Sequence, residues 1–155
     1  MSTRILILGT GNSCRSQMTE GFLKSFDFDL VVFSAGTAPS IYVEPIAVQV
    51  MREVKLDISD NFTKNVNFFI HKSFDYIITV SKIAEETCPE FFGKIGNKVN
   101  FSFKDPSLSK GMPYEIFESY RKVRDEIKIK LHQFYLENIY NSNREIKRVN
   151  TLLEV

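Results

Sequence analysis

Residue types that suit the binding of a tetrahedral oxyanion occur together in one stretch, Gly9-Thr10-Gly11-Asn12-Ser13-Cys14-Arg15-Ser16. An apolar run predicts a buried strand over Ile5–Leu8, and a helix is predicted to begin at Ser16. A tight loop between a strand and a helix directs backbone N–H groups and the helix N-terminus at one point. The N–H groups from Thr10 through Arg15 are therefore candidate donors, and the Arg15 guanidinium can donate hydrogen bonds to two oxygens at once.

The same stretch resembles the active-site loop of the low-molecular-weight protein-tyrosine phosphatases, and more closely that of the thioredoxin-coupled arsenate reductases. Both families carry Cys-(five residues)-Arg-Ser here, and the resemblance implies that this Cys is the nucleophile. Gly9 stands at that position in this chain. The resemblance also implies that Asn12 and Ser16 brace the loop. We therefore expect a loop that binds phosphate or arsenate and lacks the attacking atom.

The general acid of the family lies in an Asp-Pro loop, which Asp105-Pro106 matches. The resemblance implies that Asp105 is that acid, and the predicted loop Lys104–Pro113 follows the last strand on the ligand side. The run after it, Ser107-Leu-Ser-Lys-Gly111, lacks the paired tyrosines that line the pocket in many tyrosine phosphatases. This departure argues against a phosphotyrosine pocket.

Two other cysteine positions carry the redox relay of the arsenate reductases, on either side of a short helix. They correspond to Ser81 and Cys88 here. A serine cannot form or pass on a disulfide, so we expect no relay, and Cys88 is a weak redox candidate. Cys14 lies at a predicted helix N-terminus, where a thiolate is favoured, and a nucleophilic Cys14 stays open as an alternative.

A potassium ion lies behind the loop in some arsenate reductases. The matching positions here are Asn12, Glu20 and Ser34, with Asn65 as a fourth candidate, where an amide replaces a carboxylate that is sometimes present. The alternative role for Glu20 is that of a helix carboxylate that braces the loop.

Strand and helix patterns alternate along the chain, which predicts an α/β doubly wound, four-stranded parallel sheet with helices on both faces. The resemblance, which covers about residues 4 to 137, implies the same fold. Ligands bind such sheets at the carboxyl ends of the strands. The expected strands are Ile5–Leu8, Leu30–Ser34, Tyr76–Val80 and Val99–Phe103. The expected helices are Ser16–Phe26, Pro45–Val54, Asn65–Lys72, Ser81–Thr87 and Tyr114–Tyr140.

The length of 155 residues and the hydrophobic share of 43% fit one domain, with the abundant Phe side chains filling the core. A formal net charge of +1 gives no basis for a nucleic-acid partner. No run approaches the roughly 20 apolar residues of a membrane span, and no signal peptide is expected. Two cysteines are typical of a reducing, cytoplasmic protein.

The last residues extend past the usual end of such relatives. We expect a phosphatase-like or reductase-like domain over residues 1–140 and a C-terminal extension over 141–155. Asn141-Ser-Asn143 predicts a break, after which Ile146, Val149 and Leu153 would form one helical face. The extension could fold back onto the domain, bind a partner or a second copy, or remain disordered.

Three functions follow from these observations. The first is an oxyanion-binding relative of the two families without normal turnover. The second is a working phosphomonoester hydrolase or arsenate reductase, if the native gene encodes Cys at position 9 or if Cys14 substitutes. The third is a regulatory or interaction protein that presents its C-terminal extension to a partner.

Overall fold

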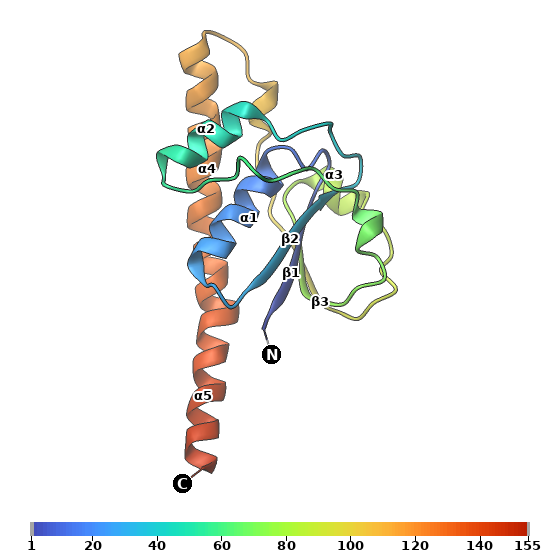
Figure 1. Cartoon of the computed structure of the whole chain (residues 1–155), viewed down its shortest axis with the longest axis vertical. Coiled ribbons are helices and arrows are strands. Elements are labelled where there is room, and N and C mark those ends of the chain that lie inside the picture. The colour runs from blue at the N-terminus through green and yellow to red at the C-terminus, as the bar shows by residue number, and fades with distance from the viewer. Residues whose placement is uncertain (1, 155) are drawn as a thin grey trace.

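A computed structural model describes residues 2–154 as a four-stranded parallel sheet with the strand order β2-β1-β3-β4 (Figure 1). The strands are β1 Arg4–Gly9, β2 Val31–Gly36, β3 Phe74–Thr79 and β4 Ile95–Asn100. The helices are α1 Arg15–Phe26, α2 Pro45–Glu53, α3 Lys82–Glu86, α4 Pro113–Tyr135 and α5 Asn141–Leu153. Short turns of 3-10 helix occupy η1 Val66–Phe68 and η2 Pro106–Leu108, and a π-helical turn, η3, occupies Leu136–Tyr140. The predicted fold class is confirmed.

The central strand β1 supplies both sides of the core because its side chains alternate between the two faces of the sheet. Ile5 and Ile7 join the larger hydrophobic cluster with α1 and α4, whereas Leu6 and Leu8 join a smaller cluster on the opposite face. All four side chains are fully buried, which explains the continuous apolar run in the sequence.

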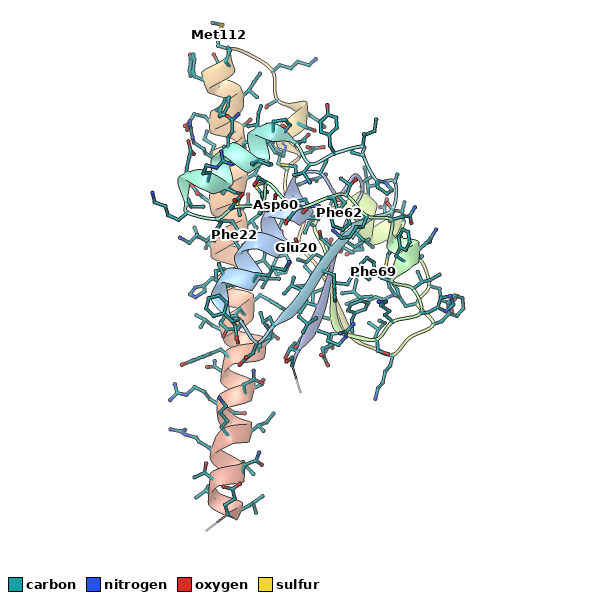
Figure 2. All side chains as sticks on the ribbon, viewed as in Figure 1. Glu20, Phe22, Asp60, Phe62, Phe69 and Met112 are labelled. Atoms are coloured by element: carbon teal, nitrogen blue, oxygen red, sulfur yellow. The ribbon has the colours of Figure 1, made fainter. Side chains whose placement is uncertain are left out.

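Helices α1 and α4 cover one face of the sheet, and α2 packs against α4 (Figure 1). The short helix α3 and the turn η1 lie on the other face. Figure 2 shows Phe22 on α1 and Phe69 on opposite sides of the sheet, in the two separate clusters. The expectation that Phe fills the core is met only in part, because the side chains of Phe28, Phe62 and Phe68 are largely exposed.

The last strand lies four residues earlier than the sequence predicts. β4 spans Ile95–Asn100 rather than Val99–Phe103 and pairs with β3 from Phe74 opposite Ile95 to Thr79 opposite Asn100. It is an edge strand with exposed polar side chains at its centre, so its sequence carries no apolar alternation. The expected helix over Asn65–Lys72 is likewise reduced to the short turn η1.

The predicted break at residues 141–143 is wrong, because the chain continues from α4 through η3 into α5 as one helical rod (Figure 1). Asn and Ser have only modestly lower helix propensity than Ala, so without Gly or Pro they do not end a helix. The rod extends beyond the sheet and does not fold back, and no side chain of α5 is buried. None of the helices within residues 2–154 has the length and apolar character needed to cross a membrane.

Candidate oxyanion site

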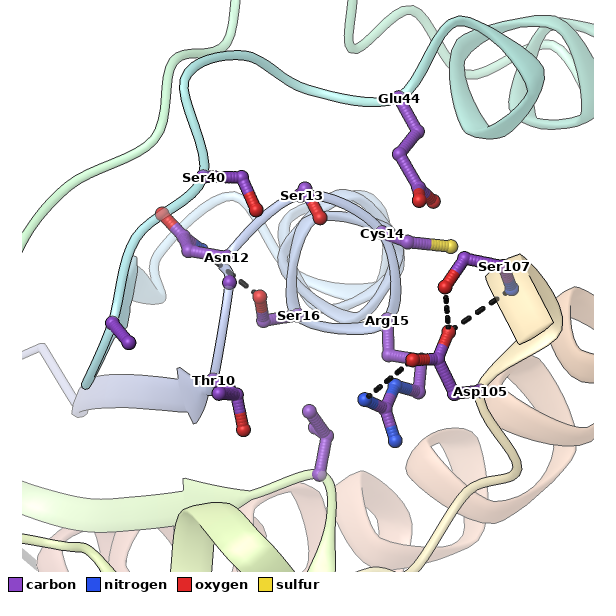
Figure 3. Close-up of a pocket in the computed structure, with 14 residues that line it drawn as sticks. Thr10, Asn12, Ser13, Cys14, Arg15, Ser16, Ser40, Glu44, Asp105 and Ser107 are labelled. Atoms are coloured by element: carbon purple, nitrogen blue, oxygen red, sulfur yellow. Dashed lines mark hydrogen bonds and ion pairs between the residues drawn. The ribbon is translucent and has the colours of Figure 1, made fainter.

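The loop from Gly9 to Ser16 lies at the carboxyl edge of the sheet, between the end of β1 and the start of α1 (Figure 3). It forms the floor of a pocket of about 300 Å³. The pocket contains every residue that the sequence predicts for oxyanion binding, together with Asp105. The complete lining consists of Gly9, Thr10, Gly11, Asn12, Ser13, Cys14, Arg15, Ser16, Ala38, Ser40, Glu44, Val80, Asp105 and Ser107.

The carbonyl groups of the loop are turned outwards and bound by neighbouring segments. Backbone N–H groups of the segment 37–44 donate to four of them, and side chains or backbone of α1 to the rest. The donors are Thr37 to Gly9 (3.1 Å), Ala38 to Thr10 (2.9 Å), Ser40 to Gly11 (2.8 Å), Gln17 Nε2 to Asn12 (2.9 Å), Glu44 to Ser13 (2.9 Å), Met18 to Cys14 (2.9 Å) and Thr19 Oγ1 to Arg15 (2.8 Å).

The N–H groups of the same loop are left for a ligand. Within residues 2–154, no backbone N–H from Thr10 to Arg15 donates to a protein acceptor. A run of backbone N–H groups without protein acceptors, in residues that line one cavity, is typical of an anion site. The outward carbonyls and the free N–H groups together explain why this loop can hold the oxygens of a tetrahedral anion.

Asn12 fixes the conformation of the loop. Its backbone has φ of 53°, in the left-handed region that Asn tolerates better than most residues. The buried side chain donates from Nδ2 to Oγ of both Ser16 and Ser34, at 2.9 Å each, and its Oδ1 accepts from the N–H of Lys64 at 3.0 Å. The predicted bracing role of Asn12 and Ser16 agrees with these contacts.

Arg15 provides the positive charge of the pocket. Its guanidinium donates to the carbonyl of Phe103 at 2.9 Å and lies 3.6 Å from Oδ2 of Asp105. The side chain is 16% exposed, so its charge acts in a largely dehydrated setting. Oδ1 of Asp105 accepts hydrogen bonds from the N–H and the hydroxyl of Ser107 (Figure 3). Arg15 and Asp105, 90 residues apart in sequence, thus face the same cavity.

Glu44 also lines the pocket, and the sequence patterns do not single it out. Its Oε2 accepts a hydrogen bond from the Tyr120 hydroxyl at 3.2 Å. Burial raises the pKa of Tyr120, and the negative charge of Glu44 raises it further, so the phenol remains a proton donor. The position immediately before Pro45, at the start of a predicted helix, is the only signal that the sequence offers.

The Cys14 thiol is poorly suited to act as a nucleophile. Burial raises its pKa well above the usual value, and the charge and hydrogen bonding of Glu44 raise it further, against the opposing effect of Arg15. The sequence predicts a favoured thiolate at this helix N-terminus, whereas burial and Glu44 favour the neutral thiol. A thiol attacks only as its thiolate, so the neutral Cys14 is unreactive near neutral pH.

Neither of the two candidate relay positions is part of the pocket lining. Ser81 caps α3, since its Oγ accepts from the N–H of Ala84 at 3.0 Å. Cys88 follows the same helix and is half-buried, and burial raises the pKa of its thiol. The structure shows Cys14 and Cys88 as free thiols.

The residues that match a potassium site already have protein partners. Lys24 places its ammonium 3.6 Å from the carboxylate of Glu20. Hydrogen bonds reach Asn12 from Lys64 (3.0 Å), Glu20 from Asn61 (2.9 Å), Ser34 from Asn12 (2.9 Å) and Asn65 from Asn67 (2.9 Å). These oxygens already accept hydrogen bonds within the protein, and the potassium site stays a prediction. Residues 2–154 contain no group of three or more His, Cys, Asp or Glu that could hold a metal ion.

Comparison with known proteins places the chain among phosphatases and arsenate reductases. The family model described as "Low molecular weight phosphotyrosine protein phosphatase" matches residues 4–148. An arsenate reductase of Shouchella clausii is 35% identical over 136 residues, covering 86% of this chain and 96% of the relative. An arsenate reductase of Staphylococcus aureus is 37% identical over 131 residues, covering 84% and 94%.

Solved structures agree with these sequence relatives. An arsenate reductase in the phosphate-binding state superposes with a TM-score of 0.70 at 25% identity, covering 87% of this chain and 98% of that one. The low molecular weight protein tyrosine phosphatase of T. tengcongensis superposes with a TM-score of 0.66 at 26% identity, covering 82% and 93%.

Proposed function

Because this chain belongs to the low molecular weight phosphotyrosine protein phosphatase family, with arsenate reductases among its relatives, we propose that it binds phosphate or arsenate without cysteine-dependent turnover. The observation that carries the proposal is the loop itself. Six consecutive N–H groups, from Thr10 to Arg15, have no acceptor among the described residues 2–154, and Arg15 lines the same pocket. Gly9 stands where the family resemblance implies the nucleophile.

The two cysteines of the chain do not replace that nucleophile in the proposal. Cys14 is held as a neutral thiol by burial and by Glu44. Cys88 does not line the pocket. Phosphoryl transfer or arsenate reduction through a thiolate therefore has no attacking group in this chain. Asp105 retains a place in the pocket, but without a covalent intermediate it has no leaving group to protonate.

Calorimetric titration with inorganic phosphate and with arsenate tests the binding part of the proposal. We expect one site per chain. Arg15→Ala should weaken binding by at least about 1.5–3 kcal/mol, because a hydrogen bond to a charged group contributes on that scale. Arg15→Lys keeps the positive charge but loses the planar pair of N–H donors. Its affinity for the anion should therefore lie between those of the unaltered chain and Arg15→Ala. Unchanged affinity in Arg15→Ala would show that the anion binds elsewhere.

The interaction function remains a separate proposal for the C-terminal extension, residues 141–155. Helix α5 carries exposed apolar side chains, among them Ile146, Val149 and Leu153, which suit a docking helix. We base the main proposal on the pocket because its geometry specifies a ligand. Removal of α5 should leave phosphate binding intact, which separates the two functions.

A further inference from the structure

The charged side chains of the pocket are unusual for an anion site. Its lining contains one cation, Arg15, and two carboxylates, Glu44 and Asp105. An ionised carboxylate is a hydrogen-bond acceptor only. It therefore repels a ligand oxygen that carries no proton, whereas it accepts a hydrogen bond from a protonated ligand oxygen.

One carboxylate oxygen of Asp105 is already occupied within the protein, and the other lies near a cation. Its Oδ1 accepts from both the N–H and the hydroxyl of Ser107, at 3.0 and 2.7 Å. Its Oδ2 lies 3.6 Å from the guanidinium of Arg15. The charge of Asp105 is therefore balanced within the protein.

Glu44 is fixed in place, but its carboxylate is less occupied. Its backbone N–H donates to the carbonyl of Ser13 at 2.9 Å, which ties it to the loop, and the Tyr120 hydroxyl holds Oε2 at 3.2 Å. Although Glu44 precedes α2, its side chain makes no capping hydrogen bond there. Figure 3 shows it directed towards the loop, beside Cys14. A thiol is a weak donor, so this carboxylate retains acceptor capacity towards the pocket.

We propose that Glu44 determines specificity by accepting a hydrogen bond from a protonated oxygen of the bound anion. The pocket then takes hydrogen phosphate and hydrogen arsenate, and it rejects oxyanions that have no O–H group. Sulfate and the dianion of a phosphate monoester belong to the rejected class. This inference rests on the proposed function, because it concerns the same pocket.

Three dianions allow the proton to be separated from the charge. At about pH 8, a phosphate monoester is fully deprotonated, since its second pKa is about 6. Hydrogen phosphate, sulfate and phenyl phosphate then all carry two negative charges, and only hydrogen phosphate keeps an O–H. Differences between phosphate and sulfate, which are similar in size, therefore report the hydrogen bond rather than net charge.

The experiment is calorimetric titration of the full chain with these three ligands at that pH. We expect phosphate to bind at least about tenfold more tightly than sulfate or phenyl phosphate, the scale of a hydrogen bond to a charged group. Glu44→Gln should abolish this preference, chiefly by a gain of at least about tenfold for sulfate, because an amide can also donate. Glu90→Gln, an exposed residue outside the pocket, should change none of the ratios.

Other outcomes would overturn the proposal. Equal affinity for phosphate and sulfate in the unaltered chain would refute it without any variant. An equal gain for all three anions in Glu44→Gln would mean that Glu44 only repels charge. Either result would leave the proposed function standing, provided phosphate binding still depends on Arg15. Absence of phosphate binding in the unaltered chain would overturn both proposals.

Discussion

Nδ2 of Asn12 donates a hydrogen bond to Oγ of Ser34 at 2.9 Å, which ties the middle of the oxyanion loop to β2. The same amide group binds Ser16 at the start of α1, and Oδ1 accepts from the backbone of Lys64. One buried side chain thus connects the loop to a strand, a helix and a distant segment. The shape of the pocket depends on this side chain as much as on the residues that face the ligand.

Replacement of Asn12 separates the role of its side chain from that of its backbone. Asn12→Ala loses three hydrogen bonds and places a Cβ residue at a φ that favours Gly or Asn, so we expect a loss of about 2–4 kcal/mol in the free energy of unfolding. Asn12→Gly loses the same hydrogen bonds but relieves the backbone, so it should be less destabilised. Both should weaken phosphate binding more than about tenfold. Urea unfolding and calorimetry measure the two effects, and equal stability of the two variants would contradict the backbone argument.

Alkaline pH should destabilise the protein through Cys14 and two tyrosines. Burial raises the pKa values of Cys14 and Tyr120, and it raises the pKa of Tyr135 to about 12. A raised pKa means that the unfolded chain releases its proton first. The contribution to stability is present below the unfolded pKa, about 8.5 for Cys and about 10 for Tyr, and is lost as pH rises towards the folded value.

The midpoint of thermal unfolding should therefore fall as pH rises above about 8.5. Cys14→Ala should flatten the first part of this decline, and Tyr135→Phe should flatten the later part without affecting the first. Scanning calorimetry of the three proteins across this pH range measures the effect. A decline with the same shape in all three would show that these groups are not its source.

The C-terminal helix should contribute little to the stability of the domain. No side chain of α5 is buried, whereas Ile139 in the preceding turn is 2% exposed. A chain that ends at Tyr140 should therefore unfold within about 1 kcal/mol of the full chain. Ile139→Ala should cost about 2–4 kcal/mol, because it leaves a cavity in the core. A large loss of stability in the truncated chain would mean that α5 packs against the domain.

The sequence predicts the oxyanion loop and the fold class because both depend on local patterns. The run from Ile5 to Leu8 identifies the central strand, and the residues from Gly9 to Ser16 identify the loop after it. The family resemblance implies that Asp105 belongs to the site, and the rule that the carboxyl ends of parallel strands meet at one edge places its loop on the same side of the sheet as Arg15. The 3.6 Å contact between Arg15 and Asp105 agrees with that rule.

Features that depend on distant contacts could not be predicted. Glu44 enters the pocket because its backbone binds Ser13 and its side chain meets Tyr120, 76 residues away. The neutral state of Cys14 depends on the same carboxylate and on burial. The predicted bounds of the last strand are wrong because an edge strand need not carry an apolar pattern. The helix through Asn141 to Asn143 continues because weak helix formers do not end a helix by themselves.

The space beside Gly9 determines whether a nucleophile can be restored. A Cβ atom on Gly9 would lie 3.0 Å from Oγ of Ser16 and 3.6 Å from Cγ2 of Val80. The contact with Oγ and a second contact of 3.3 Å with Cβ of Ser16 are both short, so Ser16 must shift by a few tenths of an ångström while it keeps its hydrogen bond from Asn12. A side chain at this position therefore requires only a small movement of Ser16, and we expect Gly9→Cys to be accommodated. Gly9→Ala adds the same Cβ without the sulfur and is the matched control.

The most direct test is hydrolysis of p-nitrophenyl phosphate by the unaltered chain, Gly9→Cys and Gly9→Ala, measured side by side. A pH of about 6 is suitable, because the monoester is then partly protonated and Glu44 should accept it. We predict turnover in Gly9→Cys alone, which would show a complete pocket that lacks one atom. Turnover in the unaltered chain at a rate similar to that of Gly9→Cys would contradict this account and point to another nucleophile. A Gly9→Cys variant that binds phosphate but shows no hydrolysis would also contradict it, because the loop would then not be a disabled phosphatase site.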